Sequence, residues 1–133
     1  MGYNSSYELT VAPVNQIGER LEAPISAGLA KMLSEEVQKL GVFEVEHPEE
    51  STWIAVEDTW IYQDEDMTLL SMKFPTVVFC IHREGEAAGD LSDTYYWRGK
   101  LQVCPAIIEY DDYDPMQLEP PKNIERVYSR QRA

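Results

Sequence analysis

The sequence has few basic residues, few cysteines and no long apolar run. Lys and Arg number 11 against 24 Asp and Glu, which gives a formal net charge of −13. No apolar run approaches the roughly 18 residues that a membrane-spanning helix requires. The first residues have neither the basic region nor the apolar core of a secretory signal. We therefore expect a cytosolic protein that contacts neither membrane nor nucleic acid directly, because both are anionic.

The scarcity of cysteine and histidine limits the chemistry that can be expected. The two cysteines, Cys80 and Cys104, are too few for the disulfide framework typical of a small secreted domain. Cys80 and His82 alternate onto one face of an expected strand, where Cys104 could face them, but structural zinc takes four ligands. Neighbours on one strand are also not a positioned nucleophile and base. We expect no metal site here.

Sequence motifs of the common enzyme classes are also missing. There is no phosphate-binding glycine loop, no H-E-x-x-H, no C-x-x-C and no G-x-S-x-G. Carboxylates do cluster, as in Asp64 with Asp66 and in Asp111, Asp112 and Asp114, but none of these clusters has EF-hand spacing. We expect no catalytic residues and no cofactor. A small carboxylate- or metal-dependent enzyme stays as an alternative.

The length and composition fit one folded domain. The chain has 133 residues, of which 44% are hydrophobic and 11% aromatic, enough for a single core. The expected elements, in chain order, are a strand at 7–14, a helix at 24–40, strands at 42–47 and 52–62, a helix at 64–74, a strand at 76–82, and a final hairpin of 94–97 with 100–110. Residues 15–23 and 84–93 are expected to be loops.

Periodicity and breaker residues predict which side chains point inward. The first helix has an apolar stripe made by Ile25, Leu29, Met32, Leu33, Val37 and Leu40, between Pro24 and Gly41. The second helix has its own stripe in Met67, Leu70 and Phe74, followed by Pro75. In the first hairpin the inward residues are expected to be Phe43, Val45, Ile54, Val56, Trp60 and Tyr62. Arg98-Gly99 fits a two-residue turn, and Pro105 marks an edge or a bulge.

The order of these elements predicts the fold class. A β-α-β-β-α-β order followed by a hairpin is typical of an α+β, ferredoxin-like fold with an added C-terminal hairpin, in which two helices cover one face of an antiparallel sheet. We expect residues 1–133 to be one domain, with 111–133 an extended tail that ends in a basic stretch containing Arg126, Arg130 and Arg132.

The negative charge is concentrated in one part of the chain. No Lys or Arg lies between Lys39 and Lys73, whereas nine acids do: Glu44, Glu46, Glu49, Glu50, Glu57, Asp58, Asp64, Glu65 and Asp66. Regularly spaced surface carboxylates can stand in for the phosphates of a nucleic-acid strand, so we predict that this acidic block binds a partner. Two simpler explanations stay open. A charge run is often only a solvated face, and the last three acids also suit the positive end of a helix dipole.

A resemblance covers the segment from the second helix to the last hairpin. It rests on 64-DEDMTLLSMKFPTVVF-79, 84-EGEAAGD-90 and 95-YYWRGKLQ-102. This succession resembles a group of short, mostly uncharacterised proteins of bacteriophages and mobile elements with "EDM..LS..FP.V.F", "GEGE..GD" and "YF..GK.Q" segments. The chain departs from the group at 83–86, where a second glycine is usual, and at Trp97, where Phe is usual. The resemblance implies an accessory phage-type protein in a bacterial cytoplasm and no particular activity.

Charge and resemblance together lead to a functional expectation. We expect a non-enzymatic acidic binding protein, and specifically a phage-encoded, DNA-mimic-like inhibitor of a host nucleic-acid-binding defence system (anti-CRISPR or anti-restriction). Its partner would be the basic surface of a nucleic-acid-binding protein or complex. A phage structural or assembly protein is a further alternative, and the sequence leaves a homodimer open.

Overall fold

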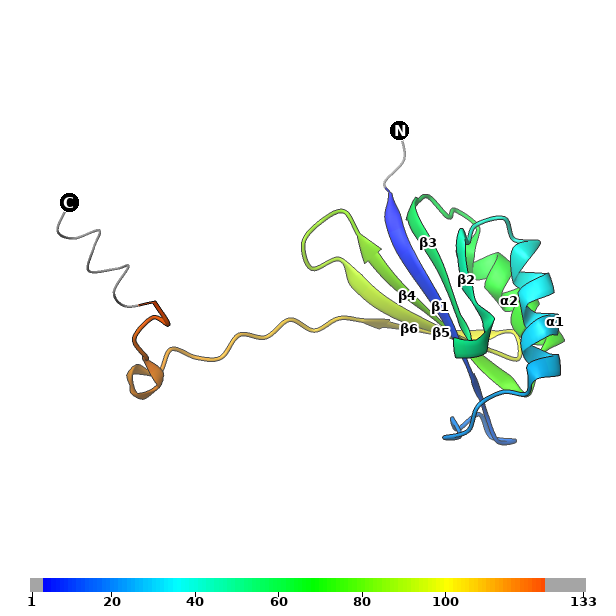
Figure 1. Cartoon of the computed structure of the whole chain (residues 1–133), viewed down its shortest axis with the longest axis horizontal. Helices are drawn as coiled ribbons and strands as arrows, with labels where there is room; N and C mark the ends of the chain where they lie inside the picture. The colour runs from blue at the N-terminus through cyan, green and yellow to red at the C-terminus, as the bar shows by residue number, and fades with distance from the viewer. Residues whose placement is uncertain (1–3, 124–133) are drawn as a thin grey trace.

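The computed structural model describes residues 4–123 (Figure 1). Its elements, in chain order, are β1 (Ser5–Pro13), α1 (Ala27–Gln38), β2 (Val45–His47), β3 (Thr52–Asp58), α2 (Gln63–Lys73), β4 (Val77–Gly85), β5 (Leu91–Trp97) and β6 (Lys100–Pro105), with 3-10 turns at Pro48–Glu50 and Pro115–Gln117. Neither helix has the length and apolar character needed to cross a membrane. The expected basic stretch at Arg126, Arg130 and Arg132 lies outside the described residues.

The strands form one open antiparallel sheet in the order β2-β3-β1-β4-β5-β6. The predicted α+β class, with an antiparallel sheet and two helices, is confirmed. β1 lies inside the sheet, where Leu9 pairs with Trp53 of β3 on one side and with Ile81 of β4 on the other. β4, β5 and β6 then follow one another as a meander along the chain. The predicted internal position of the fourth strand is therefore confirmed.

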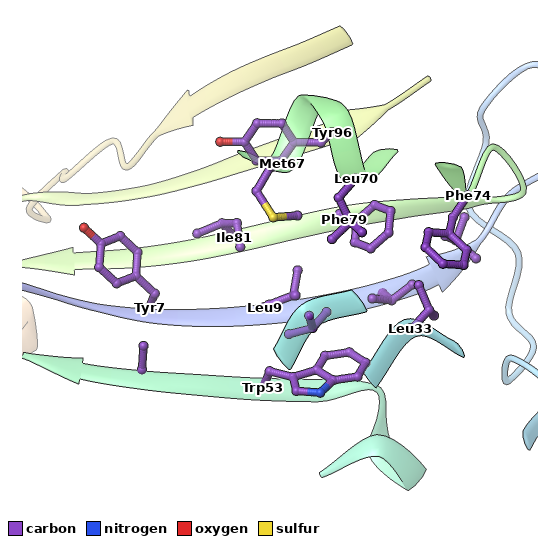
Figure 2. Close-up of a cluster of buried hydrophobic side chains, with 14 of the residues drawn as sticks. Tyr7, Leu9, Leu33, Trp53, Met67, Leu70, Phe74, Phe79, Ile81 and Tyr96 are labelled. Carbon is purple, nitrogen blue, oxygen red and sulfur yellow. The ribbon is translucent and has the colours of Figure 1, made fainter. Parts of the chain in front are cut away.

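Both helices cover the same face of the sheet, and the core lies between the helices and the sheet (Figure 2). Leu33 of α1 and Met67 of α2 are fully buried against Leu9, Phe79 and other side chains from the four central strands. Burying apolar side chains of this size contributes about 1.5–3 kcal/mol each. The opposite face of the sheet has no helix over it within residues 4–123, and we call it the open face.

Helix α1 begins three residues after the predicted start at Pro24. Ser26 is its N-cap, with the hydroxyl accepting a hydrogen bond from the Leu29 backbone N–H at 3.2 Å. A capping hydroxyl satisfies an otherwise orphan donor, which Pro24 cannot do. The predicted stripe is confirmed for Leu33 and Val37, whereas Met32 is exposed because the face that contacts the sheet is narrower than the stripe.

The inward side of the first hairpin was predicted with the wrong parity at Val45 and Ile54, and the side chain of Val56 lies outside the described residues. In β3 the buried side chains are Trp53 and Ala55, while Ile54 lies on the open face opposite Val45 of β2. Because side chains alternate along a strand, shifting the choice by one residue exchanges the two faces. An internal strand is apolar on both faces here, so alternation alone could not distinguish them.

Two further expectations for this region need correction. Strand β3 ends at Asp58, so Tyr62 is not in a strand: it precedes α2 and is exposed, although Trp60 is buried as expected. The expected strand at 42–47 is reduced to Val45–His47, and its Phe43 packs edge-on against Trp60. A mixed apolar segment of this kind gives no clear end to a strand.

The last hairpin agrees with the sequence at its turn but not in its length. Arg98 and Gly99 both have positive φ, at 48° and 76°, as the central residues of a type I′ turn do. The preceding loop was predicted at 84–93, but β4 continues to Gly85 and β5 begins at Leu91. β6 is the edge strand and ends at Pro105, as predicted, because a residue without an N–H for strand pairing is tolerated at an edge.

After β6 the chain leaves the sheet as a long extension (Figure 1). We call residues 106–118 the C-terminal arm. Its first residue still pairs, through the Ala106 N–H and the Leu91 carbonyl at 2.9 Å. Beyond it, large apolar side chains are exposed: Ile107, Ile108, Tyr110, Tyr113, Met116 and Leu118.

Candidate functional site

The structure distributes the acidic block over three places. Glu44 and Glu46 lie along the outer edge formed by β2, and Glu50 lies in the turn that joins β2 to β3. Asp64, Glu65 and Asp66 form the first turn of α2, which follows the far end of β3. The turn and the helix start are thus separated by the length of a seven-residue strand, about 23 Å. The nine acids do not lie in one row.

Several of these acids are engaged in hydrogen bonds within the chain. Asp64 accepts a hydrogen bond from the Tyr96 hydroxyl at 2.6 Å, and Asp66 accepts one from the Trp60 indole N–H at 2.8 Å. Glu46 accepts one from the Gln38 side chain at 2.9 Å. Asp64 therefore connects α2 to β5, and Glu46 connects β2 to α1. Asp66 connects α2 to the segment that follows β3. Asp64 is nevertheless exposed, and so are Glu44, Glu50 and Glu65, which accept none of these three hydrogen bonds. The side chains of Glu49, Glu57 and Asp58 lie outside the description.

Pairing of β4 with β1 adds two acids that the sequence did not assign to this surface. Glu84 pairs with Ser6, near the start of β1, and Glu86 follows directly after β4. The Glu86 carboxylate accepts a hydrogen bond from the Asn4 backbone N–H at 2.9 Å. Because the sequence predicts a loop at 84–93, it does not predict that Glu84 pairs with β1. We define the acidic end as Asp64, Glu65, Asp66, Glu84 and Glu86.

His82 lies on the open face between two carboxylates. Its Nδ1 is 2.6 Å from Asp93 Oδ1, and its Nε2 is 3.3 Å from Glu84 Oε1. The hydrogen bond to Asp93, and next that to Glu84, raise the pKa of His82 above its ordinary value, although partial burial opposes this. Two carboxylate acceptors favour the doubly protonated ring, which is the form that cannot act as a base.

Cys80 lies beside His82 on the open face, as the alternation predicted. Burial, and next the negative charge of Asp93, raise the pKa of the Cys80 thiol. A nucleophilic cysteine needs the opposite shift, because the thiolate is the reactive form. Within residues 4–123, no group of three or more His, Cys, Asp or Glu side chains has a geometry that could hold a metal ion.

A cleft of about 420 Å³ opens on the same face near the other end of the sheet. It is lined by Arg20, Val78, Tyr95, Trp97, Lys100 and Gln102, among others. The guanidinium of Arg20 lies over the Tyr95 ring, 5.4 Å from its centroid. Such a contact orients a cation at an aromatic face without neutralising it. We call this the basic cleft.

The walls of the basic cleft are fixed by the protein. The Trp97 indole N–H donates to the Pro75 carbonyl at 2.9 Å, and the ring lies so close to Gly18 that a side chain there would clash. Arg98 stacks on the Trp97 ring at 4.5 Å from its centroid. The sequence alone did not predict this cleft, because Arg20 comes from a loop that is distant in sequence from Tyr95 and Trp97.

The molecule therefore separates its charges. The acidic end lies where β1 begins and β4 ends, whereas Arg20, Arg98 and Lys100 gather at the β5–β6 turn. Comparison of the chain with protein-family models, with curated proteins and with solved structures finds no match.

Proposed function

We propose that this protein is a non-enzymatic acidic binding protein whose partner presents a basic protein surface. The observation that carries the proposal is the acidic end, in which the start of α2 on the covered face and Glu84 on the open face both lie near the start of β1. Complementary potentials accelerate encounter and select partners, and a net charge of −13 extends this field.

The acidic end divides into structural and available carboxylates. Asp64 and Asp66 are held by Tyr96 and Trp60, so they supply fixed negative charge rather than flexible contacts. Glu65 is exposed between them and is free to meet a cation. Rigid charges lose little conformational entropy on binding, which suits a docking surface.

A specific form of the proposal is inhibition of a host nucleic-acid-binding defence system. It is supported by the carboxylate surface, which can compete with phosphates for Lys and Arg, and by the resemblance of residues 64–102 to phage-type proteins. The cellular setting of the proposal is the bacterial cytoplasm. For the fold, the β2-β3-β1-β4 part of the sheet with α1 and α2 supports a ferredoxin-like unit to which β5 and β6 are added.

The test is capture of partners from bacterial lysate by the full chain, followed by titration of binding against salt. We expect a basic, nucleic-acid-binding partner whose affinity falls steeply with salt, and whose nucleic acid the protein displaces. The variant Glu65→Gln/Glu86→Gln should weaken binding by about tenfold. The matched control Glu22→Gln/Glu35→Gln removes the same charge from exposed positions elsewhere and should bind normally.

Two results would overturn the proposal. One is a set of partners that are acidic or neutral and are retained without dependence on salt. The other is equal weakening by the test and control variants, which would mean that total charge alone matters.

A second candidate function, a component of a larger assembly, is favoured by the C-terminal arm. Exposed apolar side chains at Ile107, Tyr110, Tyr113 and Met116 are unusual for a chain that acts alone, and such surfaces mark protein contacts. Light scattering that finds a large defined oligomer would favour assembly over inhibition. The enzyme alternative receives no comparable support, since His82 and Cys80 are both shifted toward protonated, unreactive forms.

A further inference from the structure

The C-terminal arm is unusual for an exposed segment, because it combines acidic residues with large aromatic side chains. Between Leu101 and Pro121 there is no Lys or Arg, while Glu109, Asp111, Asp112, Asp114 and Glu119 are all acidic. Among these acids lie Tyr110 and Tyr113, whose side chains are 89% and 77% exposed. The segment 110-YDDYD-114 therefore presents two aromatic rings and three carboxylates on an extended backbone.

The basic cleft has the complementary composition. Val78, Tyr95 and Trp97 supply apolar and aromatic walls, and Arg20 and Lys100 supply positive charge at the rim. Neither of these two cations forms an ion pair with any side chain that the structure describes. Aromatic walls flanked by unpaired cations suit an aromatic residue flanked by carboxylates.

The arm leaves the sheet at the end of β6 that is far from the cleft. Lys100 and Gln102 line the cleft at the start of β6, whereas the arm begins after Pro105 at the other end of that strand. Ala106 continues the direction of β6, and the arm then extends away from the sheet (Figure 1). In this arrangement the arm is presented to another molecule rather than to its own cleft.

We propose that the arm of one copy docks in the basic cleft of a second copy. Tyr110 or Tyr113 enters between Tyr95 and Trp97, and the neighbouring aspartates meet Arg20 and Lys100. Two copies that exchange arms reciprocally form a closed dimer, because each supplies one arm and one cleft. This inference is independent of the proposed function, since it uses neither the acidic end nor an outside partner.

The test uses charge reversal in the full chain, with molar mass measured by light scattering across a concentration series. The wild type should associate reversibly, and its association should weaken with salt. A cleft variant, Arg20→Glu/Lys100→Glu, and an arm variant, Asp111→Lys/Asp112→Lys, should each associate at least about tenfold more weakly. Mixing the two variants should restore association, because each then carries a partner for the other's reversed charge.

A matched control separates a docking effect from a general change in net charge. Lys31→Glu/Lys122→Glu alters the charge by the same amount at exposed positions outside the cleft, and it should associate like the wild type. Urea unfolding of every variant shows whether the domain remains folded. If a cleft variant unfolds, the milder Lys100→Gln variant replaces it and should still weaken association.

Cross-linking identifies which molecule supplies the arm. A photoreactive phenylalanine analogue at Tyr113, in a mixture of ¹⁴N- and ¹⁵N-labelled chains, should give cross-links to cleft peptides that carry mixed labels. Cross-links within single chains only would show that the arm folds onto its own cleft, and they would overturn the proposal. So would a wild type that stays monomeric throughout, or a mixture of the two variants that fails to associate.

Discussion

The hydroxyl of Tyr96, a fully buried residue of β5, donates a hydrogen bond of 2.6 Å to Asp64 in the first turn of α2. The same oxygen accepts a hydrogen bond of 2.8 Å from Gln63. Burial, and next the hydrogen bond to Asp64, raise the pKa of Tyr96 well above its ordinary value. One hydroxyl thus joins the acidic start of a helix to the sheet beneath it.

Replacing Tyr96 by Phe should lower the free energy of unfolding by about 1–3 kcal/mol. The reason is that Gln63 and Asp64 lose their shared partner in a partly buried place, and an unsatisfied polar group there costs its desolvation. Urea unfolding followed by circular dichroism measures the change. Tyr62→Phe, at an exposed tyrosine just before the helix, is the control and should leave stability unchanged. If Tyr96→Phe and Tyr62→Phe change the free energy of unfolding equally, the two hydrogen bonds of the Tyr96 hydroxyl contribute no net stability.

Neighbouring acids of α2 should respond differently to substitution. Asp66→Ala should cost about 1–3 kcal/mol because it leaves the Trp60 indole N–H without its 2.8 Å acceptor. Glu65→Ala should change stability little, since Glu65 is exposed. Thermal unfolding separates the two. A loss of stability in Glu65→Ala as large as that in Asp66→Ala would contradict the division between structural and available carboxylates.

Two glycines provide a matched test of the cleft wall. Gly18 has φ of 89°, and an added Cβ would lie 2.7 Å from the Trp97 ring. Gly18→Ala should therefore destabilise the protein by more than about 1 kcal/mol and shift the tryptophan fluorescence. Gly28 lies in the first turn of α1 with nothing within 4 Å of such a Cβ. Gly28→Ala should be neutral or stabilising by up to about 1 kcal/mol. A Gly18→Ala variant as stable as the wild type would show that the Trp97 ring moves to make room for the added methyl group.

His82 should make stability depend on pH in one direction. Because its pKa is raised above 6.5 in the folded state, its contribution is fully present below about pH 6.5 and is lost as pH rises through the folded-state value. The wild type should therefore gain stability between about pH 8.5 and pH 6 relative to His82→Gln. The gain should be modest and should shrink in high salt, since the His82 side chain is 43% exposed. Urea midpoints at the two pH values measure it.

The control for this prediction is His47→Gln, at a histidine distant from Asp93 and Glu84. It should keep the pH-dependent gain of the wild type. If both variants lose the pH-dependent gain in stability, or if His82→Gln keeps it, the hydrogen bond between His82 and Asp93 is not its cause.

Much of the fold could be predicted because local signals were unambiguous. The helix ending at Gln38 has a clear apolar spacing, and Arg98-Gly99 has the residues that a tight turn demands. The faces of β3 could not be predicted, because Trp53 and Ile54 are both apolar and only tertiary packing decides between them. Propensity cannot make that choice.

The candidate surfaces were predictable only where they follow the chain. The acids at the start of α2 are contiguous, so the sequence shows them directly. The additions of Glu84 and Glu86 depend on the register of β4 with β1, and the basic cleft depends on a loop residue reaching Tyr95. Contacts between distant segments carry no local signal in a single sequence.

The internal place of β1 sets the order in which the molecule can form. β1 pairs with β4 about 70 residues further along the chain, whereas β4, β5 and β6 pair through short connections. Closing a long loop costs entropy before any contact repays it, so the meander should form first and β1 should join it late. Until then the apolar edge of β4 is unprotected, and a newly made chain is at its most prone to aggregate.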